Sequence, residues 1–316
     1  MSDPLASEHE STNSGIPSID DKDFPILYQR ADQAAIQRQR SYFYLHWFYL
    51  FFLILGAGGA VFASTIPETF STWFHGGIVI ILIIGVAINL GSRVLRHDEK
   101  WFECRAIAES TKTAAWRFMM KATPFDDDST AEKTFISKIK EIRNYKQSGL
   151  DSLAKYKNLD AKPISDFMKN VRVKDMEERK NYYLEFRVHD QRTWYLRKAG
   201  SNSKNKSLWL TITMVLQGIA VISAMIQVIS TLPVNLVPIL MTCAAASIAW
   251  SRMKRYSELI QSYTIVAHEL EELEVLASGV TQESEFCQFV NDVEYAISRE
   301  HTMWCVRRDI TVNPNN

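Results

Sequence analysis

The chain lacks charge in two long stretches, and this absence defines its class. Between Arg40 and Arg93 the only charged residue is Glu68, and between Lys206 and Arg252 there is none. The two stretches are 52 and 45 residues long, and a helix needs about 20 apolar residues to cross a hydrocarbon core about 30 Å thick. Each stretch can therefore hold two membrane-spanning helices and a turn. The sequence predicts an all-α membrane protein made of two hairpins.

Four spans are expected from where the apolar residues begin and end in the two stretches. They cover about residues 47–66, 76–92, 208–229 and 234–251. No Lys or Arg occurs in the connections at Pro67 and Pro233, whereas the N-terminal, central and C-terminal segments contain four, 26 and six. Because basic residues stay on the cytoplasmic side, both termini and the central segment are predicted to be cytoplasmic. The plasma membrane is the expected location.

The N-terminal residues lack the features of a signal peptide. Residues 1–24 have no basic start followed by an apolar run. Their polar composition instead predicts a disordered tail, and residues 311–316 are read as a second, short tail. Insertion into the membrane would then use the internal span near Trp47.

Catalytic motifs are also lacking. The sequence has no Gly-rich phosphate loop, no Gly-x-Ser-x-Gly elbow and no His-Glu-x-x-His helix. His268-Glu269 has no second histidine, and the four cysteines do not have the spacing of metal ligands. We therefore expect no enzyme activity, no cofactor and no bound metal. The spans contain no acidic or basic residue, which argues against a proton-coupled pump or a voltage sensor.

Two segments of the chain resemble each other. Residues 64–67 read Ser-Thr-Ile-Pro and residues 230–233 read Ser-Thr-Leu-Pro. Thr130, Glu132 and Phe135 recur at the same spacing as Thr281, Glu283 and Phe286. The common order of these matches predicts a tandem repeat, with a first unit at residues 25–160 and a second at residues 161–310.

Each unit is expected to contain a basic lead-in helix, a two-span hairpin and a long cytoplasmic helix. Further central helices are expected near residues 130–147 and 163–199, and residues 200–207 are interpreted as a polar break before the third span. No Pro or Gly occurs between Pro238 and Gly279, so the fourth span is predicted to continue as one long helix. Apolar heptads in both exit helices favour packing within a cytoplasmic helical bundle over an intermolecular coiled coil.

The third span carries one polar face. The residues that share it are Thr213, Gln217, Ala220, Ala224 and Gln227. A glutamine facing lipid is costly, so this face should be buried against protein or water. It could be a packing seam held by amide hydrogen bonds, or it could line a pore.

A second candidate surface follows the second span. Trp101, Arg105, Glu109 and Lys112 are spaced to form one ridge on a helix. Arg105 could stack on Trp101 and pair with Glu109. We interpret the ridge as a cytoplasmic contact surface between this exit helix and a neighbour.

Several of these residues carry a family resemblance. The segment after the first hairpin contains Trp101, Arg105, Ala108-Glu109, Lys112, Trp116-Arg117 and Pro124-Phe125. The second copy contains Arg187, Asp190-Gln191, Trp194-Tyr195 and Lys198-Ala199, and closes with Asp292, Glu294, Glu300, Trp304 and Arg307-Arg308. With these residues the chain resembles a tandem pair from two branches of the SLATT family. The first lead-in departs from the pattern, because it has Ile36-Gln37 where the second has Trp194-Tyr195.

The resemblance implies a function that the residues alone do not. SLATT domains are two-transmembrane effector domains associated with nucleotide-making and nucleotide-sensing modules in prokaryotic defence, and they are thought to form pores or perturb membranes. The resemblance therefore implies that this chain is an oligomeric, pore-forming antiviral effector with a nucleotide-sensing or nucleotide-synthesising partner. No nucleic-acid partner is expected. Two alternatives remain open: a non-conducting membrane-anchored scaffold that recruits cytoplasmic partners, and a constitutive channel subunit.

Overall fold

The structure is a computed structural model that describes residues 19–145, 162–230 and 234–306. Throughout these ranges the regular elements are helices, and no strand occurs in them. The prediction of an all-α protein is therefore confirmed for the described chain. The helices divide into two compact units, which are described separately. Unit 1 comprises residues 1–39, 98–198 and 262–316, and unit 2 comprises residues 40–97 and 199–261.

Unit 2 contains the long apolar helices. They belong to α1 (Ile26–Phe62), α2 (Glu68–Leu95), α8 (Asp190–Ile229) and α9 (Val237–Lys254). Stretches of helix within Ile26–Thr65, Glu68–Met119 and Met176–Ile229 are long and apolar enough to cross a membrane. Three of the four predicted spans are thus confirmed by length and composition. α9 is not among them; it has 18 residues, and its last turn contains Arg252 and Lys254.

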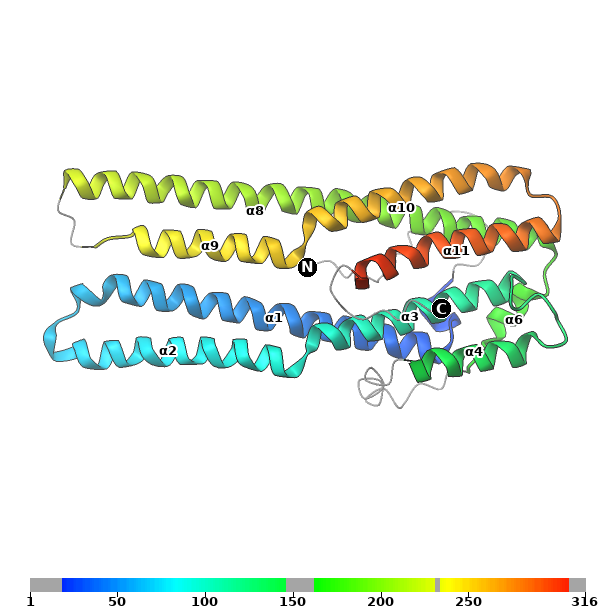
Figure 1. Cartoon of the computed structure of the whole chain (residues 1–316), viewed down its shortest axis with the longest axis horizontal. Coiled ribbons are helices and arrows are strands. Elements are labelled where there is room, and N and C mark those ends of the chain that lie inside the picture. Colours follow the sequence, from blue (N-terminus) through cyan, green and yellow to red (C-terminus); the bar gives the residue numbers. More distant parts are fainter. Residues whose placement is uncertain (1–18, 146–161, 231–233, 307–316) are drawn as a thin grey trace. The chain divides into compact units, whose positions relative to one another are not determined.

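α1 and α2 lie side by side (Figure 1). Two glycines of α1 let the helices pack closely. A Cβ added at Gly56 would lie 2.6 Å from Leu82 Cδ2, and one added at Gly59 would lie 2.9 Å from Ile78 Cγ1. Both separations are shorter than a van der Waals contact, so only glycine fits without movement of the partner.

The ends of the two hairpins differ from the prediction of continuous exit helices. The residue that caps the end of α2 is Arg96, with φ 45°, and the residue that caps the end of α9 is Arg255, with φ 52°. New helices follow at once, α3 (His97–Met119) and α10 (Tyr256–Leu276). The prediction that the fourth span continues as one helix is therefore wrong. A single left-handed residue breaks the i to i−4 hydrogen-bond ladder without any Pro or Gly.

The segment before the third span also differs from its prediction. Instead of one helix over residues 163–199, the structure has α6 (Asp166–Arg172), α7 (Met176–Tyr183) and a π-helical turn (Leu184–His189). Ser165 and Asp175 start α6 and α7 as N-caps, because each side chain accepts a backbone N–H three residues ahead. The predicted polar break at residues 200–207 is absent, because α8 runs through it unbroken.

Unit 1 holds the packed core. It includes α3, α4 (Ala131–Tyr145), α6, α7, most of α10 and α11 (Glu283–Val306). Short 3₁₀ turns lie at Asp21–Asp23 and Ala277–Gly279, and a further one, Ala63–Thr65, follows α1. The heptad seam of α3 is buried within this single chain, at Trp101, Cys104, Ala108, Thr111, Ala115 and Phe118. α3 thus buries its heptad seam within the chain, whereas the arrangement of a whole cytoplasmic bundle stays a prediction.

The repeat is visible in the order of the helices. In the first half, α1, α2, α3 and α4 follow one another, and α8, α9, α10 and α11 repeat that order. Phe135 of α4 and Phe286 of α11, which match in the two halves of the sequence, are both fully buried. Ile19 and Phe24, which had been assigned to the N-terminal tail, are also buried. Most of the second Ser-Thr-x-Pro motif (231–233) and residues 311–316 lie outside the described residues.

Candidate functional site

The polar face of α8 is only partly covered within one chain. Thr213 and Ala220 are buried, whereas Gln217 and Ala224 are exposed and Gln227 is half-buried. The structure therefore does not bring the five residues together into a single closed seam. It places the face partly against α9 and partly outward.

The covered part is a polar contact between α8 and α9. The hydroxyls of Thr213 and Ser247 lie 2.8 Å apart, and each hydroxyl also contacts the backbone carbonyl of Trp209. Ala244, one turn earlier on α9, is buried at 1% exposure. Small side chains thus let the two helices approach while hydroxyl hydrogen bonds join them, as is typical of helix pairs in membranes.

A groove of about 680 Å³ lies beside this contact. Its lining comes from α8, the end of α9 and the start of α10, and it includes Thr213 and Gln217. Lys206, Arg252 and Arg255 also line it. Sequence reasoning found Gln217 but not the groove, because the basic residues are separated from the polar face in sequence and flank the charge-free stretch rather than belong to it.

The predicted ridge on α3 is an internal contact of unit 1. Trp101 and Arg105 are buried, and Arg105 lies 3.9 Å from Glu109 in an ion pair. The ammonium of Lys112 lies 5.3 Å and 5.4 Å from the ring centres of Phe24 and Tyr28. The neighbour of the ridge is thus the start of the first lead-in helix.

A buried carboxyl lies near this ridge. Asp32 of α1 is 7% exposed, and its Oδ1 has no hydrogen-bond partner among the described residues. Burial raises the pKa of Asp32 to about 7; Asp21 adds to the rise, and Lys112 opposes it. At neutral pH this carboxyl is therefore close to half protonated.

Unit 1 also contains a buried cluster of polar side chains that the sequence did not predict. Glu294 of α11 and Arg187 of the π-helical turn form a two-pronged ion pair with both distances at 2.8 Å. Tyr183 and Thr113 donate their hydroxyls to the same carboxylate, at 3.0 Å and 2.7 Å. Arg187 is 1% exposed and Glu294 is 0% exposed. Four helical segments therefore meet at one fully buried carboxylate.

This environment shifts the neighbouring groups. Burial raises the pKa of Tyr183, and the charge of Glu294 raises it further. Burial alone would lower the pKa of Arg187, but Glu294 outweighs it and the net direction is upward. The guanidinium of Arg187 therefore stays charged beside Glu294. The sequence signal that could have revealed it is a glutamate beside the buried positions Val290 and Val293 of α11.

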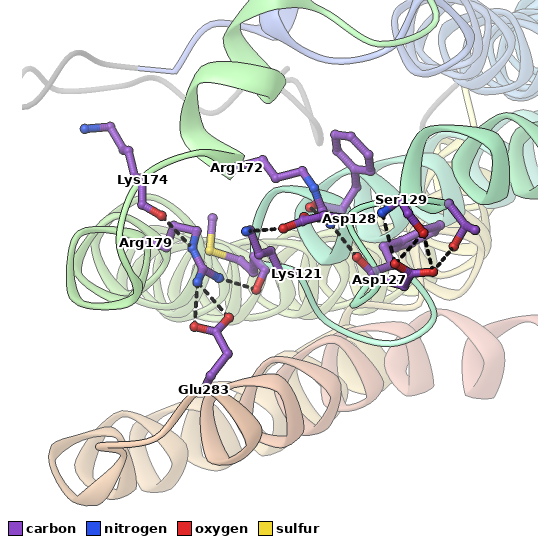
Figure 2. Close-up of polar contacts among 12 residues, drawn as sticks. Lys121, Asp127, Asp128, Ser129, Arg172, Lys174, Arg179 and Glu283 are labelled. Carbon is purple, nitrogen blue, oxygen red and sulfur yellow. Dashed lines mark hydrogen bonds and ion pairs between the residues drawn. The ribbon is translucent and has the colours of Figure 1, made fainter.

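Two arginines tie the turn after α3 to the central helices (Figure 2). Arg172 donates to the carbonyls of Phe118 and Phe125, at 2.6 Å and 2.8 Å. Arg179 donates to the carbonyl of Met120 at 2.7 Å and to both oxygens of Glu283. These contacts join the end of α3 and the loop after it to α6, α7 and the start of α11. Their role is to hold unit 1 together.

Residues that carried the family resemblance pack in the same unit. Trp194 and Tyr195 of α8 both lie 5.5 Å from the ring of Tyr263 of α10, and the ammonium of Lys198 lies 5.7 Å from the Trp194 ring centre. The side chains of Glu300 and Trp304, and all of Arg307-Arg308, lie outside the described residues. Across the described part of the chain, no group of His, Cys, Asp and Glu side chains could hold a metal ion.

Two family models match the chain one after the other. The model described as SMODS and SLOG-associating 2TM effector domain 3 matches residues 25–180. The model described as SMODS and SLOG-associating 2TM effector domain 1 matches residues 183–304. The chain therefore belongs to the SLATT family and carries two of its domains in tandem, from two branches. No curated protein and no solved structure matches the chain.

Proposed function

We propose that the chain is an oligomeric membrane effector of a nucleotide-signalled prokaryotic defence system, and that it acts by opening a pore. It is integral to the membrane, as its apolar helices and its two 2TM domains indicate. It has no enzyme activity in this proposal. Its partner is a protein that makes or senses a nucleotide and acts on unit 1.

The proposal includes a fourth crossing by α9. The helix carries no charge from Val237 to Ser251, and the Thr213–Ser247 contact joins it to α8. Trp250 lies 6.1 Å from Trp209 between ring centres, and tryptophan is enriched at membrane interfaces. Each of the two matched domains is described as having two transmembrane segments. Four crossings place both termini on the side of the basic residues, which is the cytoplasm.

The exposed amide of Gln217 carries the pore proposal. It projects from α8 among exposed apolar residues, with Met214 and Val221 both more than half exposed. An amide facing lipid has no hydrogen-bond partner there, and each unsatisfied polar group in hydrocarbon is costly. A second copy of the chain or a water-filled path would satisfy it. An oligomer with Gln217 toward its conducting path provides both.

Dye release from liposomes tests this proposal. Purified full-length protein is reconstituted with a trapped dye, with and without candidate cyclic nucleotides. Gln217→Leu should reduce or abolish release, and the matched control Val221→Leu, an exposed apolar residue one turn along α8, should leave it unchanged. Vesicles that remain tight under every condition, with folded and oligomeric protein, would contradict the proposal.

An anchored scaffold is the second candidate, and one observation favours it. Val275 and Leu276 at the end of α10 are 70% and 64% exposed, and exposed apolar groups in a unit outside the membrane can serve as a partner surface. Expression in bacteria with a potential-sensitive dye separates the two candidates. Loss of membrane potential supports the effector, whereas an intact potential together with recruitment of a protein through Val275 and Leu276 supports the scaffold.

A further inference from the structure

The groove between α8 and α9 has a basic end and an apolar wall. Lys206, Arg252 and Arg255 supply the positive charge, and Leu210, Met214 and Ile248 supply apolar surface. Arg255 is paired with Glu258 at 2.7 Å. Within the described residues, Lys206 and Arg252 have no ion-pair partner, and both are exposed. The groove therefore carries uncompensated positive charge at one end.

The position of the groove along the helices matches the headgroup layer of a bilayer. Lys206 is the last charged residue before the second uncharged stretch, and Arg252 is the first one after it. Trp209, which also lines the groove, is of a residue type that favours this layer. The apolar wall continues from this point along α8 in the direction of the hydrocarbon, because Leu210 and Met214 follow Lys206 by one and two turns.

We propose that this groove binds an anionic phospholipid of the bilayer. Lys206 and Arg252 hold the headgroup phosphate, and one acyl chain lies along Leu210, Met214 and Ile248. Basic pockets between membrane helices are suited to such headgroups. The volume of about 680 Å³ is larger than a phosphate ion requires, and a soluble anion would leave the exposed apolar wall uncovered.

The lipid would join two helices of the second hairpin. Lys206 belongs to α8 and Arg252 belongs to α9, so one phosphate bound by both restrains the pair at its basic end. This inference does not depend on the formation of a pore, because it concerns binding to the folded chain alone.

Native mass spectrometry of the full-length protein in detergent tests the inference. The protein is titrated with phosphatidylglycerol and, separately, with phosphatidylcholine of the same acyl chains. We expect phosphatidylglycerol to bind preferentially and the double variant Lys206→Gln/Arg252→Gln to bind it about tenfold or more weakly. The control variant Lys204→Gln/Arg93→Gln removes two exposed cations of the same unit that do not line the groove, and it should bind like the wild type.

Each remaining outcome overturns the inference. Equal affinity for the two lipids would show that the groove does not recognise the negative charge of the lipid. An equal loss in the two double variants would show only general attraction to negative lipid. Inorganic phosphate or a nucleotide that displaces phosphatidylglycerol at millimolar concentration would assign the groove to a soluble anion. Matching melting temperatures of the two double variants establish that any difference in binding does not come from unfolding.

Discussion

Arg96 and Arg255 occupy equivalent places in the two halves of the chain, and both have a left-handed backbone. Their φ values are 45° and 52°, and each ends the second helix of its hairpin. This conformation costs a residue with a Cβ about 1–2 kcal/mol. That both copies accept the same cost at the same place indicates that the tertiary structure requires each helix to end there.

Substitutions at Arg96 should follow the backbone preference of the new residue. We expect stability to decrease in the order Arg96→Gly, Arg96→Ala, Arg96→Val, with Gly about 1 kcal/mol above Ala. All three variants lose the same side-chain charge, so the differences between them report on the backbone alone. Thermal unfolding of the purified protein in detergent measures the order. The reverse order, with Ala above Gly, would indicate a continuous helix through residue 96.

Removal of one partner of the buried ion pair should be strongly destabilising. Glu294→Leu or Arg187→Met alone leaves an unpaired buried charge, and we expect a loss of roughly 3–5 kcal/mol for each. The double variant should lose less than the sum, because it leaves no charge uncompensated. Lys174→Met removes an exposed cation whose partner Glu178 is also exposed, and it should lose less than about 1 kcal/mol. Additive losses in the double variant would contradict this account.

The ionisation of Asp32 should make the stability of the protein depend on pH. Its pKa is about 7 in the folded chain and about 3.9 when unfolded. Between these values the folded state binds more protons than the unfolded state, so this carboxyl contributes less stability as the pH rises from 4 to 7. Asp32→Asn should therefore stabilise the protein at pH 8 and have little effect at pH 4. The difference in melting temperature between variant and wild type, measured from pH 4 to 8, checks this; a constant difference would contradict it.

The close contact of α1 and α2 predicts a contrast between two glycines. Gly59→Val should destabilise the first hairpin, because a Cβ at this position already lies 2.9 Å from Ile78. Gly77→Val on α2 adds the same side chain where no atom lies within 4 Å, and it should be tolerated. The measurement is the temperature at which each purified variant aggregates in detergent, compared with that of the wild type. Equal losses in the two variants would show that α1 and α2 do not pack as described.

Much of the fold could be predicted because the long apolar helices are the stretches from which charged residues are missing. The uncharged stretches located the long apolar helices. The breaks at Arg96 and Arg255 could not be predicted, since neither is the Gly or Pro that usually ends a helix. The run of α8 through residues 200–207 was missed because polar residues on an exposed helix surface look like a loop.

The sites were harder to predict, because they depend on residues distant in sequence. Arg187 and Glu294 are 107 positions apart, and the sequence around each residue does not indicate that the two form an ion pair. Gln217 was identified from helical spacing alone, but its exposure within one chain required the structure. Both Arg187 and Glu294 are among the residues that carry the family resemblance, but the resemblance does not indicate that they interact.

The central claim is that copies of this chain assemble into a conducting path that includes Gln217. Single-channel recording in a planar bilayer with the purified protein tests it most directly, in the presence of the activating partner or nucleotide. The account predicts discrete conductance steps whose size changes in Gln217→Leu and remains the same in Val221→Leu. A cross-linked, folded oligomer that gives no steps, or steps that are identical in Gln217→Leu and the wild type, would contradict it.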